Sequence, residues 1–144
     1  MNPQEFSNSL DEAKIVAAIG EAERKTSGQI RVYISHRNFP DALGRAQGRF
    51  TKLGMARTKQ RNAVLLYLAP RTRVFAIVGD TGVHEKCGDA FWQEVAAQLS
   101  GDLKNGPPTD AVVRAVEKTG ALLAAHFPPG REDGNELPDG IARD

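Results

Sequence analysis

The sequence AVLLYLAPRTRVFAIVGDTG occupies residues 63–82 and decides the fold. Its first part, Ala63–Ala69, is an unbroken apolar run, which is typical of a strand that is buried on both faces. The turn-like residues 70–73 separate this run from a second one, Val74–Val78. Two such runs joined by about four residues predict an antiparallel hairpin. The Gly79-Asp80-Thr81-Gly82 segment then ends the sheet.

A further strand is expected before the hairpin. Ile30, Val32 and Ile34 alternate with Arg31 and Tyr33, and this period of two predicts a strand with one buried face.

Helices are expected on both sides of these strands. Ser9 and Glu12 have the spacing of a capping box, which predicts a first helix over about 9–27, ending before Gly28. A second helix is expected from Pro40-Asp41 to Gly54, and its apolar face comprises Leu43, Ala46, Phe50 and Leu53. A third helix is capped by Asp89 and carries Trp92, Val95, Ala96 and Leu99; a fourth is capped by Thr109 and runs to Phe127.

The order of these elements predicts an α/β fold. Helices interleaved with strands require both faces of a sheet, so we expect a three-layer α/β/α sandwich around a small mixed sheet. A length of 144 residues suits one domain. We assign the domain to residues 1–128 and a polar C-terminal tail to residues 129–144.

The net charge of +1 conceals an uneven distribution. Residues 37–73 contain nine basic residues and one acidic residue, a local charge of +8, whereas residues 74–144 contain six basic and twelve acidic residues. The basic segment has four explanations that stay open: a solvated helix face, an anionic membrane surface, an acidic protein partner, or neutralisation by the acidic half of the same chain. Nucleic acid would also attract it, but the segment has few aromatic residues on which bases could stack.

Compartment and membrane association are constrained by three features. Cys87 is the single cysteine, so no internal disulfide is expected. The N-terminal residues lack the pattern of a secretory signal, and the longest apolar run is far shorter than the roughly 20 residues of a membrane-spanning helix. We therefore expect a cytoplasmic protein.

One candidate site follows from the hairpin. If Ala69 pairs with Val74, residue 63 lies opposite Asp80, and the basic residues 57–61 reach the edge where the second run ends. Carboxylates from Asp80, Glu85 and Asp89 could then hold calcium or magnesium. The side chains of Thr58, Lys59 and Arg61 could bind a phosphate or carboxylate group. Alternatively, Asp80 and Asp89 only close turns or cap helices, and the basic residues are solvated.

No complete catalytic motif accompanies this site. His84 and Cys87 have helical spacing but no further ligands nearby, so we interpret them as a structural pair at a helix start.

Three stretches of the chain resemble the TPM domain family. The first is Glu23-x-x-Thr26-x-Gly28, which runs into residues 29–32, and the second is Gly54 through Tyr67. The third is Val78 through His84, with Trp92 after it and residues 120–128 beyond. Residues 135–139 also resemble the end of the short bacterial members. The resemblance implies a compact α/β/α sandwich. Some plant relatives are described as acid phosphatases with bound calcium, and an animal relative modulates a membrane receptor.

The resemblance implies a role for a small set of residues in this chain. It places Asp80, with Arg61 and Asn62 beside it, where an acidic site is proposed in the family. Asp80 and Arg61 are thus the candidate catalytic residues, and Asn62 joins Thr58, Lys59 and Arg61 as a candidate phosphate ligand.

Three functions stay open at this point. The first is an accessory or interaction module that assists membrane-associated complexes. The second is an acid phosphatase that depends on calcium or magnesium, which would polarise the phosphoryl oxygen. The third is nucleic-acid binding through residues 37–73.

Overall fold

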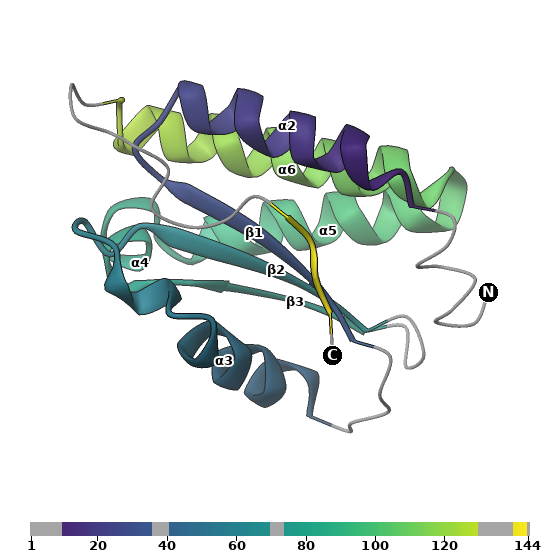
Figure 1. Cartoon of the computed structure of the whole chain (residues 1–144), viewed down its shortest axis with the longest axis horizontal. Helices are drawn as coiled ribbons and strands as arrows, with labels where there is room; N and C mark the ends of the chain where they lie inside the picture. Colours follow the sequence, from purple (N-terminus) through teal and green to yellow (C-terminus); the bar gives the residue numbers. More distant parts are fainter. Residues whose placement is uncertain (1–9, 36–40, 70–73, 130–139, 144) are drawn as a thin grey trace.

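The computed structural model describes residues 10–35, 41–69, 74–129 and 140–143. Within these residues five α-helices surround a four-stranded mixed sheet. The strands are β1 (Gln29–Ile34), β2 (Ala63–Ala69), β3 (Val74–Gly79) and β4 (Ala142–Arg143), in the spatial order β3-β2-β1-β4. β1 runs parallel to β2 and to β4, and β3 runs antiparallel to β2 (Figure 1). With helices on both faces, the fold is the predicted three-layer α/β/α sandwich.

The hairpin of β2 and β3 has the register that the sequence predicts. Ala69 pairs with Val74, and Val64 pairs with Gly79. The amide of Asp80 donates to the carbonyl of Ala63 with an N···O distance of 3.0 Å. All of β2 is buried, as expected for an unbroken apolar run. The predicted turn at 70–73 lies outside the described residues.

Three helices cover one face of the sheet: α2 (Glu12–Arg24), α5 (Asp89–Asn105) and α6 (Pro108–His126) (Figure 1). Their apolar residues pack with Ile30, Val32 and Ile34 of β1 and with the alternate residues of β2 in one core cluster. No helix in the described part of the chain has the length and apolarity needed to cross a membrane.

A thinner layer covers the opposite face. It consists of α3 (Ala42–Lys52) and the short 3₁₀ helix η1 (Met55–Arg57) (Figure 1). Phe50 and Met55 pack there in a second core cluster that includes Tyr33 and Tyr67. The prediction of one buried face for β1 is therefore wrong, since Tyr33 is only 2% exposed.

One residue of the predicted apolar face of α3 lies in solvent. Ala46 and Phe50 are buried, but the Leu43 residue is 53% exposed and is the single exposed large hydrophobic residue of the described chain. Leu43 is in the first turn of α3, which begins after Asp41.

The helix starts differ from the sequence predictions in three places. α2 is capped by Asp11, whose side chain accepts from the amide of Lys14; Ser9 lies outside the described residues. α5 is capped by Gly88 rather than by Asp89. α6 begins after Pro107, and Thr109 lies inside the helix, where its hydroxyl oxygen accepts from the amide of Asp11 at 3.0 Å. Side chains with capping chemistry occur near all three starts, so spacing alone does not select the cap.

Besides the short η1, two elements are absent from the predicted order of helices and strands. The sequence prediction contains no helix at α4 (Thr81–Cys87), although it expects a helix start at His84 and Cys87 and gives capping by Asp80 as one of two interpretations of that residue. β4 lies in the segment assigned to a polar tail, and it pairs with β1 through Tyr33 and Ala142. Ile141 just before it is buried in the three-helix core. β4 is too short to carry an alternating pattern of its own. The domain boundary at residue 128 remains a prediction.

Candidate functional site

An ion pair between Arg61 and Asp80 occupies the centre of the predicted site. Arg61 Nε lies 2.6 Å from Asp80 Oδ2, and Arg61 Nη2 lies 2.8 Å from Asp80 Oδ1, so the contact is bidentate. The Asp80 side chain is 4% exposed and that of Arg61 is 48% exposed. The hydrogen bonds and negative charge of Asp80 raise the pKa of Arg61. The two predicted catalytic groups are therefore brought together, and they bind each other.

Asp80 also begins helix α4. Its Oδ1 accepts from the amide of Thr81 at 2.7 Å, and its carbonyl accepts from the amides of Val83 and His84 at 3.1 Å each. An aspartate in this position satisfies amides that have no partner within the helix. The structure thus gives Asp80 a capping role, which was one of the two interpretations of this residue.

The loop that carries Arg61 fits closely against α4. Arg61 has a positive φ of 52°, and its carbonyl accepts from the amide of Gly82 at 2.8 Å. A Cβ atom at Gly82 would lie 2.3 Å from the carbonyl oxygen of Gln60 and 2.6 Å from that of Arg61. Only glycine fits at residue 82 without moving this backbone. The close approach places Arg61 directly over Asp80.

Most of the predicted phosphate ligands have partners inside the protein. Thr58 is buried, and its hydroxyl oxygen accepts from the amide of Asn62 at 3.2 Å. Asn62 is 1% exposed, and its Nδ2 donates to Ser27 Oγ at 3.2 Å; Gln60 Nε2 donates to the same oxygen at 3.0 Å. Lys59 is exposed. Thr58 and Asn62 stabilise the loop, so the side chains that solvent can reach are those of Lys59 and Arg61.

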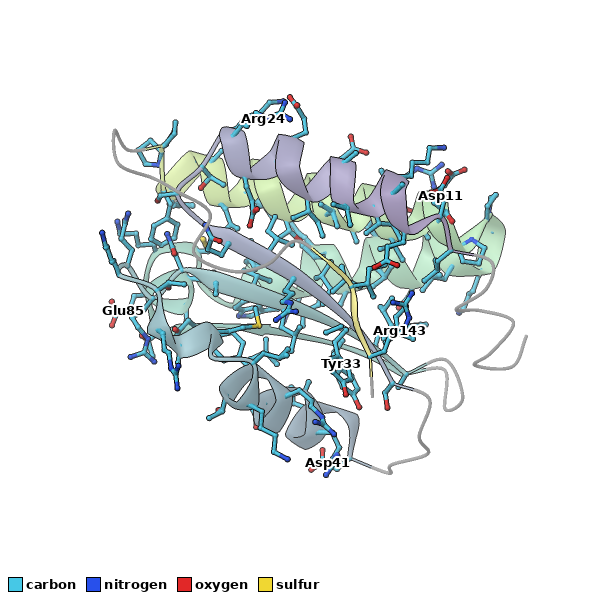
Figure 2. All side chains as sticks on the ribbon, in the orientation of Figure 1. Asp11, Arg24, Tyr33, Asp41, Glu85 and Arg143 are labelled. Atoms are coloured by element: carbon cyan, nitrogen blue, oxygen red, sulfur yellow. The ribbon has the colours of Figure 1, made fainter. Side chains whose placement is uncertain are left out.

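Two of the three carboxylates proposed for calcium or magnesium are described, and they differ in surroundings: the Asp80 side chain is buried and Glu85 is exposed. Glu85, a residue of α4, is exposed on the outside of the molecule (Figure 2). Asp80 is committed to Arg61, and the side chain of Asp89 lies outside the described residues. In the part of the chain that is described, no group of three histidine, cysteine or carboxylate side chains could hold a metal ion. The described residues therefore do not fit a resident cation, and the site with Asp89 stays a prediction.

The predicted structural pair His84 and Cys87 lies on α4. Nε1 of Trp92 donates to His84 Nδ1 at 3.5 Å, and the ring of Trp92 covers Gly79 so closely that a Cβ there would lie 1.8 Å from it. Cys87 is half-buried, and burial raises the pKa of its thiol. A thiol with a raised pKa is a weaker nucleophile at neutral pH.

The two helical layers differ in charge. Residues 41–62, here called the basic layer, contain six basic residues and one acidic residue: Arg45, Arg49, Lys52, Arg57, Lys59, Arg61 and Asp41. The three helices on the other face contain eight acidic and five basic residues. Lys52 and Arg57 are exposed and make no ion pair with any described residue.

A contact between Arg49 and Tyr33 could not be found from the sequence. The guanidinium of Arg49 lies 5.5 Å from the ring centroid of Tyr33. Arg31 is on the same face of β1 as Tyr33, because residues two apart in a strand share a face. The alternation of Arg31 and Tyr33 with aliphatic residues predicts that the two share one face of the strand. It cannot predict that α3 packs on this face and brings Arg49 to Tyr33.

The family follows from comparison with known domains. The sequence profile of the TPM domain matches residues 4–122. The chain belongs to the TPM domain family. The matched part of this TPM domain includes β1 to β3 and the Arg61–Asp80 pair, and it ends within α6.

Solved structures agree with this assignment. The NMR structure of the BA42 protein from the psychrophilic bacterium Bizionia argentinensis is 37% identical, has a TM-score of 0.86, and is matched over 92% of each chain. The N-terminal domain of the cg2496 protein from Corynebacterium glutamicum is 17% identical, with a TM-score of 0.59 over 92% of this chain and 77% of that one. The N-terminal domain of a P. gingivalis protein is 15% identical, with a TM-score of 0.62 over 77% and 72%. The last two show a shared fold alone. No curated protein matches this sequence.

Proposed function

We propose that this TPM domain is an accessory module that binds an acidic protein surface through its basic layer. The observation that carries the proposal is the separation of charge between the two helical layers. Six basic residues and one acidic residue lie on the thin layer, whereas the three-helix layer has an excess of acidic residues. A one-signed surface attracts a partner of opposite charge and accelerates its association.

An exposed apolar residue lies in the same layer. Leu43 is 53% exposed at the start of α3, close in sequence to Arg45. Protein interfaces typically combine apolar contacts with a polar rim, and arginine is enriched in them. Leu43 would provide an apolar contact, and the surrounding cations would select an acidic partner.

The Arg61–Asp80 pair supports a binding role over hydrolysis. Both carboxylate oxygens of Asp80 accept hydrogen bonds, from Arg61 and from the amide of Thr81. They are therefore engaged within the protein instead of binding a metal ion or removing a proton. General base catalysis requires a group within reach of the proton that it removes. The described residues around Asp80 instead stabilise the junction of two loops.

Affinity capture with charge-matched variants tests the proposal. Three baits are used in nuclease-treated lysate: wild type, the double variant Lys52→Glu/Arg57→Glu, and the double variant Lys25→Glu/Lys104→Glu. The captured proteins are quantified by mass spectrometry. The two variants have the same net charge, but the second changes only the three-helix side. We expect an acidic protein to be recovered by wild type and the second variant and lost from the first.

Two results would contradict this function. One is equal recovery of the same proteins by all three baits. The other is turnover of p-nitrophenyl phosphate that depends on calcium or magnesium and is lost in Asp80→Asn, which would favour the phosphatase. Binding of nucleic acid that weakens steeply with salt would show that the partner of the basic layer is nucleic acid and not an acidic protein.

A further inference from the structure

Two arginines that form no ion pair with a described carboxylate, Arg31 of β1 and Arg49 of α3, lie on the α3 side of the sheet, and Arg49 contacts Tyr33 there. The ring of Tyr33 stacks on that of Tyr67, with centroids 5.4 Å apart and planes 5° apart. The guanidinium of Arg49 lies over the ring of Tyr33 at 5.5 Å. Arg31 pairs in register with Leu65, as Tyr33 does with Tyr67, so all four strand residues face the α3 layer. Figure 2 shows Tyr33 on the side of the sheet that α3 covers.

Neither guanidinium is neutralised by a described residue. Arg31 and Arg49 are half-buried, and neither forms an ion pair with any side chain in the described ranges. Nε of Arg31 is buried and has no hydrogen-bond partner there. Two described carboxylates on neighbouring elements have other partners: Asp41 caps α3, and Glu12 pairs with Arg143 of β4.

A buried donor that lacks a partner costs free energy because its hydration has been removed. Residues two apart on one face of a strand are separated by roughly 7 Å. A long arginine side chain spans such a distance, so the Arg31 and Arg49 guanidinium groups can reach one small anion between them. The planar fork of arginine matches the oxygens of phosphate and carboxylate groups.

We propose that Arg31, together with Arg49 over the ring of Tyr33, binds a compact oxyanion, and that a phosphate group is the preferred one. This site is separate from the Arg61–Asp80 pair, which lies where β2 begins and β3 ends. Arg49 belongs to the basic layer as well, but Lys52 and Arg57 take no part in the anion site, so substitutions at those two residues test docking of an acidic protein separately. A doubly charged phosphate neutralises both cations, whereas acetate neutralises one.

Thermal unfolding at constant ionic strength tests the site with inorganic phosphate and, separately, with sodium acetate. Ligands that bind only the folded state raise Tm. We expect phosphate to raise the Tm of wild type and of Arg57→Met, a matched control in the same layer. Arg31→Met and Arg49→Met should each weaken phosphate binding at least tenfold, and acetate should act more weakly than phosphate.

The variants also have a readout in the absence of any anion. Because Arg31→Met removes a half-buried cation that forms no ion pair within the described residues, we expect the free variant to unfold at the same or a higher Tm than wild type. Equal responses to phosphate in wild type, Arg31→Met and Arg49→Met would overturn the proposal. A wild-type Tm that does not change up to tens of millimolar phosphate would overturn it as well. If Arg31→Met does not fold, the phosphate response of Arg49→Met alone tests the site, because Arg49 lies on the surface helix α3.

Discussion

The guanidinium of Arg61 lies against both carboxylate oxygens of Asp80, at 2.6 and 2.8 Å, and so joins the loop before β2 to the start of α4. The hairpin register sets this contact, because the amide of Asp80 bonds to the carbonyl of Ala63. The two residues that sequence and resemblance select as catalytic candidates thus connect two structural elements. Their first measurable role is in stability.

Asp80→Ala should lower the free energy of unfolding by about 2 kcal/mol. The variant removes the cap of α4 and leaves the hydrogen bonds of Arg61 unmade. Urea unfolding followed by circular dichroism measures the change. Glu85→Ala, an exposed carboxylate on the same helix, is the control and should change stability by less than about 0.5 kcal/mol. Equal effects of the two substitutions would show that the ion pair contributes nothing.

Gly82→Ala should destabilise the protein by about 2–3 kcal/mol. Its Cβ would lie 2.3 Å from the carbonyl oxygen of Gln60, so the backbone of the Arg61 loop must move. Gly101→Ala in α5 is the matched control, because nothing lies within 4 Å of its Cβ. That control should stabilise the protein by up to about 1 kcal/mol, as alanine favours a helix over glycine. A harmless Gly82→Ala would contradict the close approach of loop and helix.

Leu43→Ser should leave stability within about 0.5 kcal/mol of wild type, whereas Phe50→Ala should cost about 3–5 kcal/mol. The first residue is exposed and the second is buried in the core below α3. If Leu43 contacts a partner, its substitution should still reduce capture of that partner. A large loss of stability in Leu43→Ser would place the side chain in the core, as the helical periodicity alone predicts.

The labelling rate of the Cys87 thiol should rise at a higher pH in the folded protein than in the protein unfolded in urea. Burial raises the pKa of this thiol, and the charge of Lys86 acts against that effect. The unfolded thiol therefore ionises first. Its contribution to stability is complete below the unfolded pKa and decreases as pH rises from there through the folded pKa. The rate of labelling as a function of pH measures both values. Identical midpoints for folded and unfolded chains would be inconsistent with a half-buried thiol.

The parts of the fold that follow from local patterns were predictable. The apolar run of Ala63–Ala69 and the short connection to Val74 predict the hairpin and its register, because few arrangements bury such a run. From that register the meeting of Arg61 and Asp80 at one edge also follows. The bidentate contact does not follow, because it depends on the positive φ of Arg61 and on the fit of Gly82.

The parts that depend on distant segments were not predictable. β4 is two residues long and exists because β1 offers it an unpaired edge. Tyr33 looks like a solvent-facing residue in its own strand, but in the fold it stacks on Tyr67, lies under Arg49 and belongs to the second core cluster. The exposure of Leu43 likewise depends on where α3 meets the sheet. Such contacts between residues far apart in the chain leave no periodic signal in sequence.

Binding of a defined acidic probe, mapped by NMR, tests the central claim most directly. Poly-L-glutamate is titrated into the ¹⁵N-labelled protein at low ionic strength, and amide shifts are compared between the basic layer and the three-helix layer. We predict saturable shifts concentrated in residues 42–61, weakened by Lys52→Glu/Arg57→Glu and retained in Lys25→Glu/Lys104→Glu. Shifts concentrated in α2, α5 and α6, or none at low salt, would contradict the assignment of the basic layer as the binding surface.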